Sequence, residues 1–211
     1  MNIIRTWSQL DLESMKRNIM GLKACKDEDM VIHELVSANA YTFTPAIGGP
    51  MQGICPPFLS VDTIEDGCEL RKNGVTVPVL VRYYSKPDNV TAYVKQLHRN
   101  YLAISLDNLE DYKAVSARVI PIFGGLLAVH LKVTIGDVDG DFSCRDESSS
   151  IDNLILVKST LGLFCQGIYT ELDAQEPEEE KMRKVQILHS IADKLEEISG
   201  KEFPIRHVFC K

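Results

Sequence analysis

The sequence predicts an α/β fold built on a mainly parallel sheet. Two observations predict it: strand-like apolar runs recur along the chain with helix-like segments between them, and most of these runs are continuous rather than alternating. Continuous apolar runs are typical of strands that are buried on both faces. Repeated strand–helix alternation means parallel strands joined by right-handed crossovers.

Seven strands are expected. They span residues 30–36, 58–61, 78–83, 102–106, 126–133, 163–169 and 205–209. Periodicity alone leaves two architectures open, an open doubly wound sheet and a (β/α)8-type barrel. A G-x-G-x-x-G motif does not follow the first strand, so the dinucleotide-binding version of the open sheet has no support.

The helices are predicted from caps and apolar stripes. Asp11 is expected to cap a helix with an apolar stripe over residues 12–22. Thr63 and Asp66 open a second helix that ends at Asn73, in a capping-box pattern. Asp107 with Glu110 repeats that pattern for the next helix but one.

Two further helices follow. Residues 151–161 form a short apolar one, and residues 178–199 form the clearest one, with acidic residues in the first turn and Gly200 after its end. Its expected apolar stripe consists of Met182, Val185, Leu188, Ile191 or Ala192, Leu195 and Ile198.

Composition limits the function. The chain has 211 residues, treated as a single domain over 1–211, and its net charge of −7 opposes binding to nucleic acid and to anionic membrane. No apolar run approaches the roughly 18 residues of a membrane span, and no signal-peptide pattern opens the sequence. The six cysteines are scattered, which predicts reduced thiols and a cytoplasmic protein.

A family resemblance favours the barrel. Residues 37–41, Ser-Ala-Asn-Ala-Tyr, resemble the Lys-Ala-Asn-Ala-Tyr signature of the alanine racemases, with serine at the lysine position. Residues 60–81 resemble the stretch from that family's second helix into its third strand. Residues 129–133 and 167–170 resemble its fifth and sixth strands, so that the resemblance runs from about residue 3 to 208.

The resemblance implies a (β/α)8-type TIM barrel with pyridoxal phosphate (PLP) at the C-terminal ends of its strands. The family adds a β-rich C-terminal domain, which supplies a catalytic tyrosine across a homodimer. This chain stops at the seventh strand, so we expect an incomplete barrel of about seven strands without that domain. Its first and seventh strands are expected to have edges that are exposed or covered by a partner, and a homodimer is expected.

The candidate site residues are Ser37, Asn39, Tyr41, Arg82, Lys132 and His207. Ser37 stands where the family has the Schiff-base lysine, and a hydroxyl cannot form an imine. Asn39 and Tyr41 match the motif, which places the tyrosine at the cofactor phosphate, and Arg82 is a candidate anion-binding guanidinium. These residues are cofactor-binding candidates, and none of them is assigned a catalytic role.

Lys132 matches a lysine in the family's fifth strand. It is predicted to pair with an acid such as Glu171, and it is a weak substitute for the missing lysine because it comes from a different strand. His207 is what remains of a His-x-Ala-Asn-Ser phosphate loop. Asp139 lies near the position where the family has an active-site arginine, and Glu171 stands where the family has a stacking histidine.

Two other acidic patterns each allow two interpretations. Asp137, Asp139 and Asp141 resemble part of a calcium loop but lack the spacing and glutamate of an EF-hand, so a solvated turn is expected. Glu171 and Asp173 near Lys132 suggest an acid–base pair or metal site, against a salt-bridged rim, which is preferred. No metal site is predicted.

Three functions stay open. The first is a PLP-dependent amino-acid racemase, an isomerase, acting on a small amino acid. The second is a non-catalytic barrel that binds PLP or another small anion, and the third is an interaction scaffold, natural or engineered. We favour an alanine-racemase-like barrel with impaired or lost catalysis, that is, a pseudoenzyme.

Overall fold

A parallel sheet of eight strands forms the centre of the molecule. The structure, a computed structural model, describes residues 33–34, 36–37, 58–136, 139–200 and 205–210. The strands are β1 (His33–Glu34), β2 (Val36–Ser37), β3 (Leu59–Val61), β4 (Val79–Val81), β5 (Leu102–Leu106), β6 (Leu127–Lys132), β9 (Leu163–Leu172) and β10 (Ile205–Cys210). Their order is β1-β10-β9-β6-β5-β4-β3-β2, and every pair is parallel.

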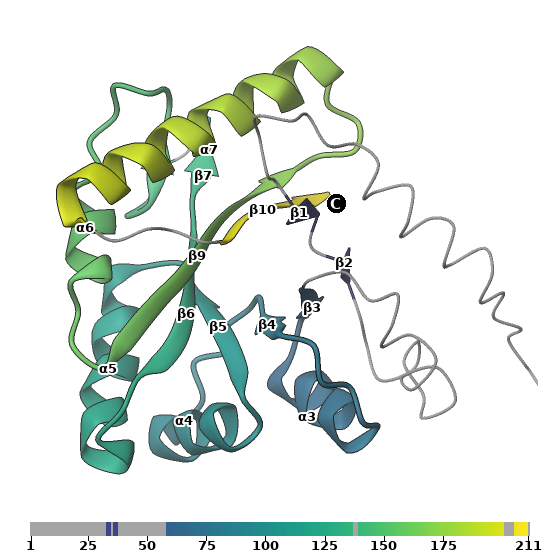
Figure 1. The fold of residues 1–211 in the computed structure, drawn as a ribbon, viewed down its shortest axis with the longest axis vertical. Helices are drawn as coiled ribbons and strands as arrows, with labels where there is room; N and C mark the ends of the chain where they lie inside the picture. The colour runs from purple at the N-terminus through teal and green to yellow at the C-terminus, as the bar shows by residue number, and fades with distance from the viewer. Residues whose placement is uncertain (1–32, 35, 38–57, 137–138, 201–204, 211) are drawn as a thin grey trace, which may run out of the picture.

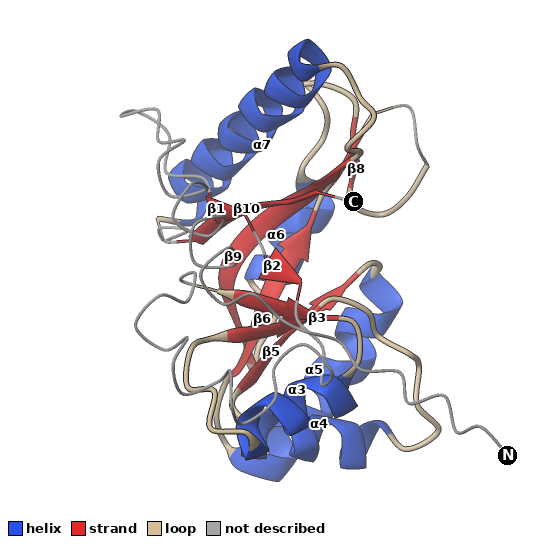
Figure 2. Ribbon diagram, turned by 90° about the vertical axis from the view of Figure 1, so that its right-hand side faces the viewer, coloured by secondary structure: helices blue, strands red, loops and turns tan. Residues whose placement is uncertain are grey.

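The sheet curls, and its helices lie outside it (Figure 1). The helices are α3 (Ile64–Lys72), α4 (Val90–Arg99), α5 (Leu109–Phe123), α6 (Asp152–Lys158) and α7 (Glu178–Ser199). Figure 2, turned by 90°, shows α3, α4 and α5 gathered at one end of the molecule and α7 at the other. A second, two-stranded parallel sheet joins β7 (Thr134–Ile135) to β8 (Ser143–Cys144).

The two ends of the strand order are neighbours in the sequence. β1 pairs with β10, β2 pairs with β3, and one position separates β1 from β2. The prediction that the last strand has an open edge is therefore wrong, because β10 lies between β9 and β1. Pairing on both sides satisfies the backbone groups that an edge strand would leave exposed.

The core lies between the outer face of the sheet and the helices. Alternate strand residues such as Leu59, Val81, Ile104 and Val129 are fully buried in one large apolar cluster with the helices. The opposite face forms the interior of the barrel, where Phe58, Leu80, Ala103 and Tyr169 make a smaller cluster. Every residue of β3, β4 and β5 is buried, as expected for strands covered on both faces.

Most predicted elements appear at or near their expected positions. The helix α7 has the predicted bounds, and Thr63 caps α3 by accepting a hydrogen bond from the Asp66 amide at 3.2 Å. The predicted helix over residues 11–22 lies outside the described residues. No helix in the described part of the chain has the length and hydropathy needed to cross a membrane.

Two details of the helices differ from the prediction. Asn108 rather than Asp107 caps α5, accepting from the Asp111 amide at 2.9 Å. In α7, Met182 and Ile198 are exposed although they belong to the predicted stripe, whereas Val185, Leu188, Ile191, Ala192 and Leu195 are buried. The stripe therefore meets the sheet only along the middle of the helix.

Candidate functional site

Charged side chains follow the strands at one end of the barrel. Arg82 comes directly after β4, Asp107 directly after β5, and Lys132 is the last residue of β6. Glu171 is the last but one residue of β9. Because parallel strands end at the same edge, these residues share the C-terminal mouth, where barrels of this kind carry their active sites.

Lys132 is enclosed by partners. Its Nζ lies 3.3 Å from Glu171 Oε1 and 3.9 Å from Asp107 Oδ2, and 5.7 Å from the centre of the Tyr83 ring. The side chains of Lys132 and Glu171 are only 15% and 14% exposed. The predicted pairing of Lys132 with Glu171 is therefore confirmed. Asp107 is oriented toward this lysine, and its neighbour Asn108 caps α5 instead.

Arg82 forms a second ion pair at the mouth. The residue is 4% exposed, its guanidinium pairs with Asp62, and its backbone amide donates to the Val61 carbonyl at 2.8 Å. The guanidinium also lies 5.1 Å from the centre of the Tyr83 ring. An incoming anion would have to displace or share the Asp62 carboxylate, so Arg82 is held as a structural cation in this arrangement.

Two cavities meet at Lys132. One has a volume of about 190 Å³ and is lined by Asp107, Lys132, Thr134, Asp139 and Phe142 among others. The other has a volume of about 380 Å³ and runs past Glu171 to the start of α7. Lys132 therefore carries its charge into both spaces.

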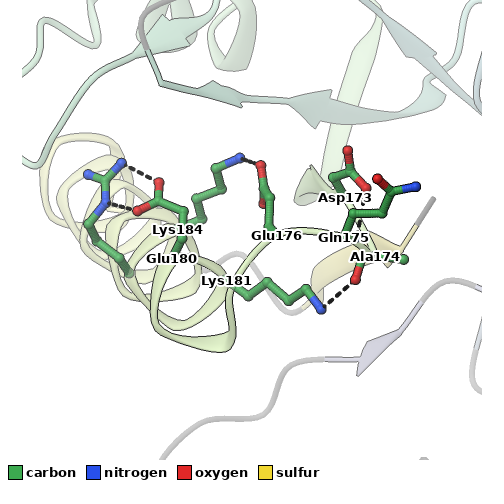
Figure 3. A network of polar contacts seen from close by, with 8 residues as sticks. Asp173, Ala174, Gln175, Glu176, Glu180, Lys181 and Lys184 are labelled. Carbon is green, nitrogen blue, oxygen red and sulfur yellow. Dashed lines mark hydrogen bonds and ion pairs between the residues drawn. The ribbon is translucent and has the colours of Figure 1, made fainter.

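The second cavity is bounded by a network of charged side chains. Lys184 of α7 pairs with Glu176, and Lys181 donates to the Ala174 carbonyl at 3.2 Å (Figure 3). Asp173 lies in the same turn, where its carboxylate accepts from the Gln175 amide at 2.8 Å. These local contacts support the salt-bridged rim that the sequence favoured.

The interior beneath the mouth is polar but uncharged. The Tyr169 hydroxyl donates to Ser105 Oγ at 3.0 Å inside the barrel, whereas the Tyr112 hydroxyl of α5 donates to the His130 carbonyl at 3.1 Å from the core outside the sheet. Burial lowers the pKa of His130 to about 4, so this imidazole is neutral at pH 7. Burial likewise raises the pKa of the Tyr169 hydroxyl, which stays protonated.

The remaining candidates are placed only in part. Ser37 lies in β2, where its backbone pairs with Ser60 of β3, and His207 lies in β10, where its backbone pairs with Tyr169 and His33. Asn39, Tyr41 and Asp137 lie outside the described residues. The structure therefore places Ser37, Lys132 and His207 on strands of one sheet and Arg82 directly after β4 of that sheet, and it brings the side chains of Arg82 and Lys132 to the same tyrosine ring.

In the acidic loop, Asp141 makes structural hydrogen bonds to neighbouring segments. Asp141 Oδ2 accepts from the Leu109 amide at 2.8 Å, and the Asp141 carbonyl accepts from Asn153 at 2.9 Å. Asp139 lines the smaller cavity. Within the described ranges, no three His, Cys, Asp or Glu side chains are grouped as a metal site would require.

Sequence reasoning missed three residues of the mouth. Asp62 and Tyr83 were not singled out, and Asp107 was assigned to a helix cap. A usable signal existed, because Asp62 and Asp107 each follow directly after a predicted strand. In a parallel sheet that position places a side chain at the ligand-binding edge.

A curved parallel sheet with its helices outside and charged residues at its C-terminal mouth places this chain in the class of barrel-like α/β domains. The particular relatives are alanine racemases. That from Methanococcus maripaludis is 24% identical over 207 residues, which cover 95% of this chain and 52% of the relative. The alanine racemase from Halalkalibacterium halodurans is 26% identical over 208 residues, which cover 97% of this chain and 51% of the relative.

A solved structure gives the same result. The alanine racemase of Clostridium difficile 630 superposes with a TM-score of 0.72 at 22% identity, covering 93% of this chain and 53% of that chain. No protein-family model matches the chain. The chain therefore has the alanine racemase-family fold, and it spans about half the length of the curated relatives that it matches.

Proposed function

We propose that this chain is an alanine-racemase-like barrel domain that has lost racemisation and binds a small zwitterion of the amino-acid class at its C-terminal mouth. One observation carries the proposal: the ammonium of Lys132 is held between Glu171 and Asp107 at the mouth. A cation and carboxylates therefore border the same small cavity, which is what a zwitterion needs.

The proposed loss of racemisation rests on the lack of a suitable lysine amine at the site. PLP chemistry requires a lysine that forms an imine with the cofactor and then moves a proton. Ser37 has a hydroxyl at the position of that lysine. Lys132 would have to leave two carboxylate partners and lose a proton before it could attack an aldehyde, and it comes from β6 rather than the first strand.

The charges at the mouth do not fit PLP. The carboxylates of Asp62, Asp107 and Glu171 lie against two cations, Arg82 and Lys132, and both cations are already paired. A phosphate dianion there would meet net negative charge in partly buried surroundings, where Coulomb repulsion is poorly screened. We therefore infer that the described residues do not hold the cofactor as the family does, and we derive no reaction step through it.

A zwitterion fits the same groups better. The smaller cavity is lined by Asp107 and Asp139, which can accept hydrogen bonds from an ammonium, and by Lys132, which can donate to a carboxylate. Ser143 and Thr134 add hydroxyls to the lining. Charge-assisted hydrogen bonds of this type are about twice as strong as neutral ones.

The assembly belongs to the same proposal. We infer a barrel of about seven strands, with β1 and β2 acting as parts of one strand, a homodimer, and a cytoplasmic location. Cys68, Cys144 and Cys165 support the location, because all three are buried free thiols of the kind that reducing compartments maintain.

The test combines binding with a cofactor titration. L-alanine and D-alanine are titrated calorimetrically, while PLP is titrated by absorbance and followed by borohydride reduction and mass mapping. We expect saturable amino-acid binding, no reducible adduct and no racemisation of alanine with added PLP. Asp107→Asn should weaken amino-acid binding about tenfold, whereas Glu65→Gln, at an exposed acid on α3, should leave it unchanged.

The opposite results would overturn the proposal. An imine at Lys132 together with racemisation would restore the enzyme hypothesis. PLP binding without an adduct would favour the non-catalytic cofactor-binding barrel. If neither an amino acid nor PLP binds, only the interaction scaffold among the three functions survives.

A further inference from the structure

The N-terminal mouth of the barrel, opposite the site described above, contains a cavity of about 450 Å³. Its buried wall includes Phe58, Leu102, Ala103 and Leu127, and its rim includes exposed side chains such as Tyr101 and Leu126. This volume lies in the range of small-molecule sites, which are mostly apolar with a few polar groups.

Two alanines on neighbouring strands explain the space. Ala103 of β5 and Ala128 of β6 both belong to the interior layer formed around Phe58, Leu80 and Tyr169. In barrels of this type the interior layers are filled mainly by bulky branched residues. Where both neighbours are alanine, the layer is not filled, and the cavity opens to the N-terminal face.

A β-bulge supplies one polar group. The pairing of β6 with β9 shifts between Val129 and His130, so that Cys165 pairs with Val129 and Gly167 with His130, while Gln166 has no partner in the ladder. Gln166 is partly exposed, and it lines the cavity. Bulges often redirect a side chain in this way beside a site.

The charges exclude an anion site. Arg71 lines the cavity, but its guanidinium donates to the carbonyls of Asn100, Val75, Val77 and Tyr101 at 2.7–3.0 Å. These bonds connect the segments that precede β4 and β5, and they engage Nε and both terminal nitrogens of the Arg71 guanidinium. Among the described residues that line the cavity, Arg71 is the single lysine or arginine, and none carries a carboxylate.

We propose that the N-terminal mouth is a second ligand site, which takes a small neutral aromatic molecule with one hydrogen-bonding group directed at Gln166. The ring lies against Phe58 in the space that Ala103 and Ala128 leave open. This inference does not rest on the amino-acid site, which is formed by the opposite ends of the same strands.

Indole is the probe, because it is planar, neutral and carries one N–H donor. The full chain is titrated with indole by saturation-transfer NMR, with benzoate and toluene as comparisons. We expect saturable indole binding, weaker benzoate binding, and a loss of at least about tenfold in indole affinity for Ala103→Leu, because the added side chain fills the cavity. Leu161→Ala, an exposed leucine that does not line the cavity, should bind indole as the parent does.

A second variant separates loss of the site from loss of the fold. Gln166→Leu removes the polar group at a partly exposed position, so it should weaken indole several-fold and leave toluene unchanged. The proposal is overturned if no indole binds, if benzoate binds more tightly than indole, or if folded Ala103→Leu or Gln166→Leu binds indole with the parent's affinity.

Discussion

Lys132 at the end of β6 and Glu171 near the end of β9 form an ion pair across neighbouring strands, with 3.3 Å between Nζ and Oε1. Both side chains are largely shielded from water. The pair stabilises the mouth of the barrel, and it also determines the charge that a ligand meets there.

Removing both members of this pair should cost less than the sum of removing each one alone. We expect Glu171→Gln and Lys132→Gln each to lower the free energy of unfolding by about 2 kcal/mol, because each leaves a poorly solvated charge. The double variant should lose clearly less than the sum. Urea unfolding measures all three, and Lys113→Gln, an exposed lysine on α5, is the matched control. Additive losses would show that the two groups do not interact.

His130 should make stability depend on pH. Its folded-state pKa of about 4 lies below the ordinary value of 6.5, so the unfolded chain binds the proton more readily. Stability from this group is complete above pH 6.5 and is lost as the pH falls through 6.5 toward 4, by about 3 kcal/mol in total. Denaturant unfolding at pH 7, 5.5 and 4.5 measures the slope.

The comparison needs a variant that cannot titrate. His130→Asn should flatten the fall between pH 6.5 and 4 relative to the parent, even if it is less stable overall. His98→Asn, at an exposed histidine on α4, should keep the parent's slope. Equal slopes in the parent and His130→Asn would contradict the prediction.

The identity of the residue that caps α5, which the sequence analysis assigned to Asp107, can be tested directly. Asn108→Ala should lower the free energy of unfolding by about 1 kcal/mol, because the Asp111 amide loses its side-chain acceptor. Asp107→Asn should leave the cap intact, because the Asp107 carboxylate is directed at Lys132. If thermal unfolding shows Asn108→Ala to be neutral, the hydrogen bond seen here contributes nothing to stability.

Ser37→Lys tests whether the surroundings of residue 37 can still position a lysine to form an imine with PLP. We expect this variant to form a borohydride-reducible adduct with PLP, at a concentration where the parent forms none, because a covalent imine at residue 37 would offset the repulsion of the cofactor phosphate by the acids at the mouth. Mass mapping should locate the adduct at residue 37. Ser148→Lys, in an exposed loop, should show only background labelling. Equal labelling of both variants would indicate that the pocket no longer positions an aldehyde.

Strands such as β5 were predictable because burial on both faces requires a continuous apolar run, and the predicted and observed bounds of β5 agree. The cap of α5 was not, because Asp107 and Asn108 are both capping residues, and only the tertiary position of Lys132 assigns the first to the mouth. The second cavity was missed for a similar reason. Ala103 and Ala128 lie far apart in sequence, and only the strand register makes them neighbours.

The pairing of β10 with β1 has a consequence for synthesis. His33 and His207 are partners in the ladder although most of the chain lies between them. On the ribosome β1 is made well before β10, so β1 lacks that neighbour while the intervening helices and strands fold. Long-range pairing of this kind slows folding, which exposes the nascent chain to aggregation until β10 has been made.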